Sequence, residues 1–165
     1  MLAYDARKIF ELAEQFHRAS SILLSAFDQK NIQVIPPSFT CIAFSLELYL
    51  KSLITLEKGG YTKGNHNLEK FIEMLNPDTK DKLRLYAIAI AEPQIKQFQD
   101  FAKAKGLPPL PDFDFDAALT ASKNAFVNWR YVYEENFKEN EGWQASEIIL
   151  AVRKIILELH PEWAT

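Results

Sequence analysis

Residues 38–57 constrain the fold more than any other part of the sequence. Their apolar side chains repeat with the period of an α-helix and occupy most of the helix circumference instead of a single stripe. Between Pro37 and Glu57 the only charged residues are Glu47 and Lys51, which stand four positions apart. A helix of this composition has to be covered on several sides, so the pattern predicts a central helix surrounded by others.

The other periodic segments are also helical. Residues 4–27 and 145–159 carry apolar stripes at i, i+3, i+4 spacing, and Pro161 follows the second stripe. Shorter helices are expected at residues 66–75, 77–91, 93–105 and 116–135. No alternating strand pattern persists. The sequence therefore predicts one all-α domain over residues 1–165, an up-and-down helical bundle with extra short helices and a Pro-rich strap at residues 106–116.

Local signals set the expected ends of these helices. Pro36 and Pro37 predict an extended entry to the central helix with Ser38 as its cap, and Gly59 predicts its end. Pro93 is expected to begin a separate helix. The stripe of the first helix is expected to contain Ile9, Leu12, Ala13, Phe16, Ala19, Leu23 and Phe27.

The charge and composition of the chain exclude some functions. A net charge of -3 and a pI of about 5.7 argue against a protein that coats nucleic acids in general, because such a protein needs a basic face. The single cysteine, Cys41, allows no intramolecular disulfide. There is no stretch of the signal-peptide type and no uninterrupted apolar run of membrane-spanning length. We therefore expect a cytoplasmic protein without a membrane segment.

The sequence offers no metal or cofactor motif. Asp112, Asp114 and Asp116 alternate in PDFDFD, but the later glycine and glutamate of a calcium loop are missing, so we expect the second or third of them to cap the following helix. No pair of histidines has the spacing of zinc ligands, and glycine-rich phosphate loops and nucleophile elbows are absent from the sequence. We expect neither a metal nor a cofactor.

Two interpretations of Glu47 and Lys51 are open. They form either a solvated pair at the rim of the core or a pair in which Glu47 faces inward and needs a cation from another helix. Arg130 is the natural candidate for that cation, because aromatic surroundings suit a planar guanidinium. On a helix it shares a face with Phe126, Tyr133 and Phe137. An Arg130–Glu47 contact would be either part of a site or a structural link between helices.

Two blocks of the sequence resemble the HEPN domain family (higher eukaryotes and prokaryotes nucleotide-binding). Residues 43–75, AFSLELYLKSLITLEKGGYTKGNHNLEKFIEML, are similar to the E-L-x-L-K core helix of that family, with its glycine-containing turn and G-H-[ND]-L helix start. Residues 126–135, FVNWRYVYEE, are similar to the aromatic-Arg-Tyr-x-x-Glu stretch of one branch. The resemblance implies an all-α bundle and a homodimer with a cleft between protomers.

Many members of the family are ribonucleases of toxin–antitoxin, phage-defence or RNA-processing systems, with an arginine followed after four to six residues by a histidine. In this chain Glu135, Asn136 and Phe137 stand where that histidine would follow Arg130, so no imidazole is there to move a proton. The resemblance then implies a non-catalytic protein that binds RNA, a nucleotide or a protein partner such as a nucleotidyltransferase. The residues expected to line or brace the cleft are Glu47, Lys51, Trp129, Arg130, Tyr133, Glu134 and Asn136.

Two alternatives to this function are open. Arg153 and His160, with six residues between them, match the ribonuclease pattern formally and would make the protein a metal-independent endoribonuclease. A pattern this short also arises by chance. The other alternative is a structural interaction module, in which Arg130 and Glu47 only join two helices.

Overall fold

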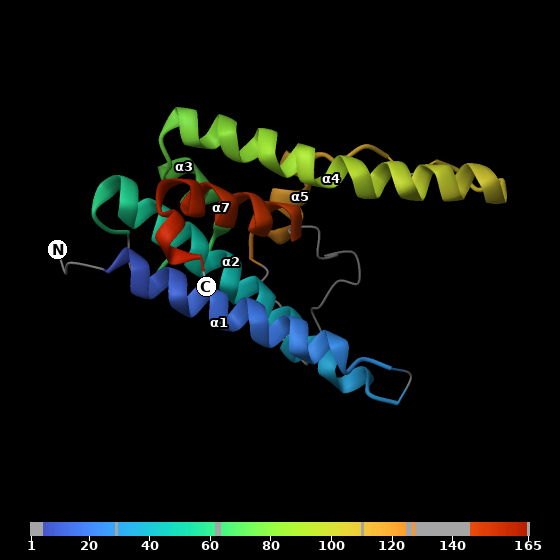
Figure 1. Cartoon of the computed structure of the whole chain (residues 1–165), viewed down its shortest axis with the longest axis horizontal. Helices are drawn as coiled ribbons and strands as arrows, with labels where there is room; N and C mark the ends of the chain where they lie inside the picture. Colours follow the sequence, from blue (N-terminus) through green and yellow to red (C-terminus); the bar gives the residue numbers. More distant parts are fainter. Residues whose placement is uncertain are drawn as a thin grey trace.

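The computed structural model of the chain describes residues 5–28, 30–61, 64–109, 111–124, 127 and 146–164. Its helices are α1 (Ala6–Ser25), η1 (Ile32–Val34), α2 (Ile35–Lys58), α3 (Leu68–Met74), α4 (Pro77–Lys105), α5 (Phe115–Ser122), α7 (Ser146–Leu159) and η2 (Pro161–Trp163), where η marks a 3-10 helix (Figure 1). The described residues contain no strand, so the predicted all-α class is confirmed.

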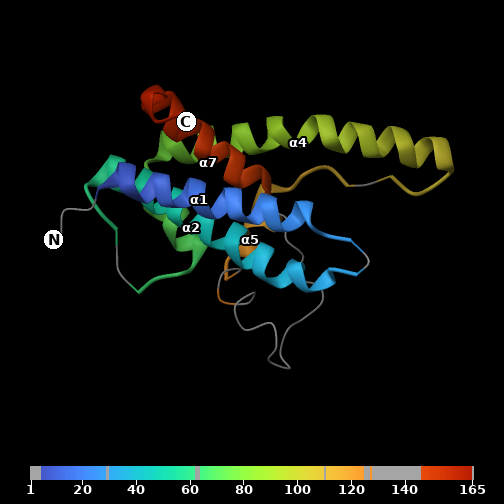
Figure 2. The ribbon, with the colours of Figure 1, turned by 60° about the horizontal axis from the view of Figure 1, so that its bottom comes forward.

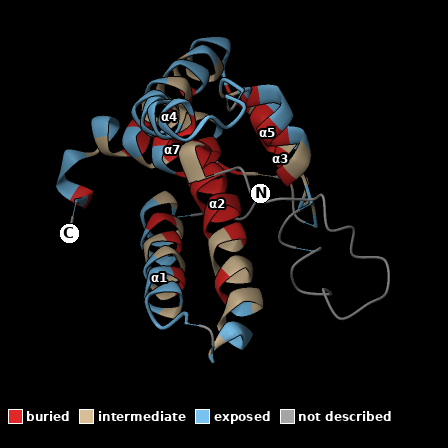
Figure 3. Ribbon diagram, turned by 90° about the vertical axis from the view of Figure 1, so that its right-hand side faces the viewer, coloured by how far each residue is buried: buried red, intermediate tan, exposed pale blue. Residues whose placement is uncertain are grey.

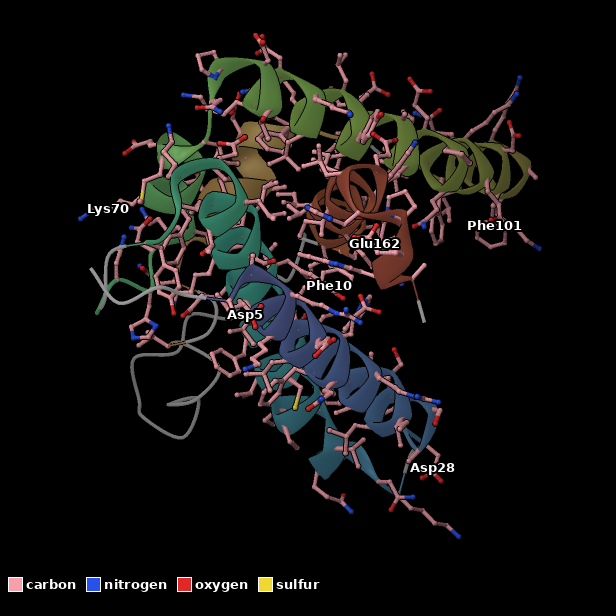
Figure 4. The ribbon with its side chains drawn as sticks, turned by 60° about the vertical axis from the view of Figure 1, so that its left-hand side comes forward. Asp5, Phe10, Asp28, Lys70, Phe101 and Glu162 are labelled. Atoms are coloured by element: carbon pink, nitrogen blue, oxygen red, sulfur yellow. The ribbon has the colours of Figure 1, made fainter. Side chains whose placement is uncertain are left out.

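The helices are arranged around α2. Helices α1 and α2 run antiparallel and lie side by side, and α2 also contacts α3 and α7 (Figure 1 and Figure 2). Helix α4 packs on α7 and reaches α5. Its C-terminal half extends past the end of α7 and exposes Phe98 and Phe101 (Figure 1 and Figure 4). The helical bundle predicted from the sequence is confirmed.

The central position predicted for residues 38–57 is also confirmed. Every residue from Ser45 to Thr55 is buried, and this part of α2 is surrounded by the other helices (Figure 3). The segment Ile32–Lys58 is long and apolar enough to cross a membrane by length and composition, but 67% of its most apolar window is buried inside the protein. This burial fits a core helix, and the absence of a membrane segment stays a prediction.

The buried face of α1 differs from the predicted stripe. Leu12 is 40% exposed and Phe27 is exposed as well, whereas Phe10, outside that stripe, is only 1% exposed. The reason is a contact from the other end of the chain: the ring of Trp163 lies 5.5 Å from that of Phe10, and Tyr49 of α2 lies 5.7 Å away on a second side. The buried face of α1 is therefore turned toward both α2 and η2, and local periodicity contains no information about η2.

The start of α2 also differs from the prediction. The helix begins at Ile35, so Pro36 and Pro37 lie in its first turn instead of forming an extended entry. Proline is tolerated there because the first N–H groups of a helix have no intrahelical partner. Ser38 is not the cap; its hydroxyl donates to the carbonyl of Ile35 at 2.7 Å.

The predicted pair of helices at residues 77–91 and 93–105 is wrong. Helix α4 is continuous over 29 residues, with Pro93 inside it. Proline removes the hydrogen bond to the carbonyl of Ala89, but Ala89 and Pro93 are both exposed, so water can bond that carbonyl. Helix ends are predicted better: Gly59 ends α2 and Gly106 ends α4, both with the positive φ that favours glycine.

Candidate functional site

The carboxylate of Glu47 is the centre of a polar cluster inside the bundle. Glu47 is fully buried, and Lys51, one turn later on α2, places its Nζ 2.5 Å from Glu47 Oε1. The Nδ1 of His66 lies 3.0 Å from Glu47 Oε2 and 3.1 Å from Oε1. The prediction that Glu47 faces inward is confirmed, and the alternative of a solvated rim pair is wrong. Its cation comes from the same helix, with His66 as a second partner.

Aromatic rings surround the ammonium group of this cluster. Lys51 Nζ lies 4.9 Å from the ring centroid of Tyr61 and 5.4 Å from that of Phe71. The negative faces of such rings stabilise a cation that has lost part of its hydration. Only 11% of the Lys51 side chain is exposed. Charge pairing and ring contacts together therefore offset the cost of desolvating this ion pair.

His66 reaches Glu47 because of the turn before α3. Asn67 is the N-cap of α3 and accepts a hydrogen bond from the N–H of Lys70 at 3.2 Å, while Asn65 accepts one from the N–H of Asn67 at 3.1 Å. These two bonds fix the backbone on either side of His66. Sequence reasoning treated this histidine only as part of a helix start. The signal that could have found the contact is the resemblance itself, because E-L-x-L-K and G-H-[ND]-L are its two specific elements in this block.

The predicted residues of the aromatic-arginine segment lie outside the described residues. These are Trp129, Arg130, Tyr133, Glu134 and Asn136. A contact of Arg130 with Glu47 therefore stays a prediction, as does the structural link between helices that was its alternative.

A second polar cluster joins α1, α2 and α7. Arg153 of α7 donates to both carboxylate oxygens of Glu14 of α1, from Nε at 2.6 Å and from Nη2 at 3.1 Å. The hydroxyl of Tyr49, on α2, donates to the same carboxylate. The Nδ1 of His17 lies 3.4 Å from the Tyr49 oxygen. Four side chains from three helices thus form one network.

Burial and pairing shift the pKa values of this network in different directions. Burial raises the pKa of Glu14, but the hydrogen bonds from Arg153 and Tyr49 outweigh it and leave that pKa below its usual range. Burial raises the pKa of Tyr49 strongly, and Glu14 raises it further. Burial lowers the pKa of His17, with Arg153 adding to this and Glu14 opposing it. At neutral pH the network therefore holds an ionised carboxylate, a guanidinium, a neutral phenol and a neutral imidazole.

The network borders a surface cleft of about 710 Å³ between α1 and α7. Glu14, His17 and Arg153 line it together with Phe10, Leu150 and Trp163. Phe10 projects from the side of α1 that faces α7 and η2 (Figure 4). Sequence reasoning named Arg153 but missed Glu14, His17 and Tyr49, because their meeting depends on how three helices pack.

The two polar clusters lie on different sides of α2. Glu47 and Tyr49 are two residues apart, which corresponds to about 200° around a helix. Glu47 therefore points toward the turn before α3, and Tyr49 points toward α1 and α7. Glu47 and Lys51 are not among the residues that line the cleft.

The formal ribonuclease pair is not brought together in this cleft. Arg153 lines it, but His160 does not. The Nδ1 of His160 lies 2.9 Å from Glu162 Oε1, and its ring stacks on Trp163 at a centroid distance of 4.3 Å and an angle of 11°. The imidazole that shares the cleft with Arg153 is that of His17.

The aspartates of PDFDFD act locally. Asp114 caps α5 and accepts hydrogen bonds from the N–H groups of Asp116 and Ala117 at 2.9 and 3.0 Å, as predicted. Asp116 forms a two-bond pair with Arg84 at 2.7 and 2.8 Å. Within the part of the chain that the structure describes, no three carboxylate, imidazole or thiol groups gather as metal ligands would.

Lowering the pH from about 7 to about 5 is expected to destabilise the protein partly through His17. Its pKa in the folded state lies below the ordinary value of 6.5, so the unfolded state binds the proton more readily. The contribution of His17 to the free energy of unfolding is therefore complete above that value and is lost as the pH falls below it. We expect the free energy of unfolding of His17→Gln to fall less between about pH 7 and 5 than that of the parent protein, as measured by urea unfolding at several pH values. Equal slopes for the two proteins between pH 7 and 5 would contradict the assignment.

Comparison of the chain with protein-family models, with curated proteins and with solved structures finds no match. The resemblance to the HEPN family therefore rests on residues 43–75 and 126–135 of the sequence. Function has to be argued from the two side-chain clusters and from the chemistry of those residues.

Proposed function

We propose that the protein is a HEPN-like module that binds RNA through the aromatic-arginine segment, residues 126–136, and does not cleave it. The contact between Glu47 and His66 carries this proposal. This contact joins the E-L-x-L-K element, residues 47–51, to the H-N-L helix start, residues 66–68. The residues that carry the resemblance in this block are therefore in physical contact with one another. That contact supports a genuine relationship to the HEPN family over a chance similarity of short sequence motifs.

The roles of the residues follow from their chemistry. The carboxylate of Glu47 is enclosed and satisfied by Lys51 and His66, so Glu47 acts as a brace for the bundle and not as a group that meets a ligand. Binding is assigned to the segment that contains Trp129 and Arg130. Aromatic side chains stack on bases and a guanidinium pairs with phosphate, while Glu134 limits how many phosphates the segment accepts.

Gel-shift and integrity assays on the same RNA test this function. We expect purified protein to retard a single-stranded RNA at low salt and to leave its length unchanged after prolonged incubation. Arg130→Ala should weaken the retardation about tenfold, because one charge-assisted contact is lost. Lys138→Ala is a control that removes one positive charge nearby in the sequence. If the protein degrades RNA in the absence of metal ions, and if Arg130→Ala abolishes this degradation without unfolding the protein, the non-catalytic proposal is refuted.

A metal-independent endoribonuclease is the second candidate, and the position of Arg153 in an open cleft favours it. Two imidazoles could serve such a reaction: that of His160 completes the formal pattern, whereas that of His17 shares the cleft with Arg153. If the protein cleaves RNA, His160→Ala and His17→Ala separate these possibilities. Activity that survives His160→Ala excludes that residue as essential.

The cellular setting is proposed from the resemblance alone. A homodimer and a role in defence or in a toxin–antitoxin pair follow from it, with a nucleotidyltransferase as the kind of protein partner expected. The cytoplasmic location expected from the sequence stays a prediction. A structural interaction module remains the alternative that the enclosure of Glu47 favours. Absence of RNA retardation at low salt would support that alternative.

A further inference from the structure

We propose that the cleft between α1 and α7 is a binding site for a small organic phosphate, a phosphomonoester attached to an apolar or aromatic body. This site is separate from the RNA-binding segment proposed above. It is lined by charged groups of α1 and α7 on one part of its surface and by apolar side chains on another. Its volume of about 710 Å³ is in the range of sites for small molecules.

Arg153 supplies a prepositioned guanidinium. Two of its donors are bonded to Glu14, and Glu14 is in turn held by the hydroxyl of Tyr49. A guanidinium has five N–H donors, so about three remain for a ligand. The Arg153 side chain is 31% exposed. Because its orientation is already fixed, a ligand that binds these donors does not have to order the side chain.

One cation of the cleft lining has no ion pair among the described residues. Glu11 is paired with Arg7 at 2.9 Å, and Glu14 is paired with Arg153. Arg18 also lines the cleft, and it forms no ion pair with any of the described residues. Because Arg7 lies outside the lining, the formal charges of the lining sum to zero, and Arg18 is the group that an anion would pair with.

His17 adds capacity for a second negative charge. It lines the cleft beside Glu14, Arg153 and Tyr49, and burial lowers its pKa so that it is neutral in the absence of a ligand. A bound dianion would favour the protonated imidazole. A phosphomonoester carries close to two negative charges at neutral pH, whereas a carboxylate carries one. The guanidinium groups of Arg153 and Arg18, which both line the cleft, favour a phosphate with its three acceptor oxygens, and the difference in charge adds to this.

The apolar wall explains why the anion should carry an organic body. Phe10 and Trp163 are packed against each other, and His160 stacks on Trp163 and holds it in place. Leu150 lies on α7 and is 40% exposed, although it belongs to a helix with a well-formed apolar stripe. Phe10 and Trp163 are themselves nearly buried, at 1% and 9% exposure, so the exposed part of this wall is mainly Leu150. Inorganic phosphate would leave that part in contact with water, and an aromatic body would cover it.

Titration with 1-naphthyl phosphate, followed by its fluorescence, tests the site. We expect saturable binding of one molecule per chain with a dissociation constant of about 0.1–1 mM. Inorganic phosphate lacks the body and 1-naphthol lacks the charge, so each should bind at least about tenfold more weakly. Absence of saturable binding by 1-naphthyl phosphate, or equal binding of 1-naphthol, would overturn the proposal.

Two matched variants on α1 locate the site. Arg18→Ala removes the cation of the cleft that has no ion pair among the described residues, and it should weaken binding of 1-naphthyl phosphate about tenfold. Lys8→Ala removes an exposed cation from the same helix outside the cleft and should leave binding unchanged. An equal loss in both variants would mean that the probe responds to overall charge, and the site would be rejected.

A third variant separates this proposal from the proposed RNA binding. Arg130→Ala should weaken RNA retardation and leave the binding of 1-naphthyl phosphate unchanged. Arg18→Ala should weaken the binding of 1-naphthyl phosphate and leave RNA retardation unchanged. If both ligands respond only to Arg130→Ala, the cleft is not the phosphate site. If RNA does not bind but 1-naphthyl phosphate does, the RNA-binding function fails and the cleft stands.

Discussion

Replacement of Lys51 by methionine is expected to lower the free energy of unfolding by about 3 kcal/mol. The substitution keeps the length of the side chain but removes the cation that lies 2.5 Å from the fully buried carboxylate of Glu47. An unpaired buried charge is costly, and His66 reduces the cost only in part, because 44% of its side chain is exposed. Chemical unfolding followed by circular dichroism measures the change.

The double variant Glu47→Leu, Lys51→Met shows whether the cost comes from the unpaired charge. Removing both charges leaves apolar side chains of similar volume in a buried position, so we expect stability within about 1 kcal/mol of the parent protein. The exposed i, i+4 pair of Arg7 and Glu11 is the matched control. Arg7→Met should cost less than about 0.5 kcal/mol, since solvated pairs contribute little. If Lys51→Met costs no more than Arg7→Met, the Glu47 carboxylate is not held in a dry interior.

The features that the sequence predicts well are those that depend on local patterns. The period of residues 38–57 and the near-absence of charge in them predict a central helix, and α2 is buried without interruption from Ser45 to Thr55. Helix α7 likewise buries the middle of the stripe predicted for it, from Ile148 to Ile156, although Leu159 at its end is exposed. Asp114 begins α5 and Gly59 ends α2, as their chemistry requires. Each of these signals lies within a few residues of the structure it specifies.

The features that the sequence does not predict depend on distant contacts. Glu14 and Arg153 are 139 positions apart, and neither stands in a motif that would pair them. Pro93 is a misleading signal because proline breaks a helix strongly only where the lost hydrogen bond cannot be replaced, and Ala89 and Pro93 are both exposed to water. The buried charge of Glu47 lies between these two cases. Its burial is predicted from the pattern of its own helix, but its contact with His66 depends on a separate turn.

Helix α2 gives the molecule two independent polar clusters. Glu47 and Lys51 face the turn before α3, where the pair is enclosed, while Tyr49 faces the α1–α7 cleft, where Arg153 is open to ligands. An enclosed cluster contributes to structure, and one that borders a cleft can contribute to recognition. The stability effect of Lys51→Met and the binding effect of Arg18→Ala should therefore be separable in the same protein.

Replacement of Phe10 by alanine is expected to lower the free energy of unfolding by about 4 kcal/mol. The side chain is 1% exposed, and its ring centroid lies 5.7 Å from that of Tyr49 and 5.5 Å from that of Trp163. Its removal leaves a cavity where α1, α2 and η2 meet, and it also takes away one wall of the cleft. Urea unfolding measures the loss of stability.

Leu12→Ala on the same helix is the matched control for this substitution. Leu12 belongs to the stripe predicted from the sequence, yet it is 40% exposed, so its truncation should cost less than about 1 kcal/mol. If the two substitutions have equal effects, or if Leu12→Ala costs more, the buried face of α1 is the one that periodicity alone predicts. If Phe10→Ala costs much more than Leu12→Ala, the C-terminal turn decides which face of α1 is buried, because Trp163 packs on Phe10.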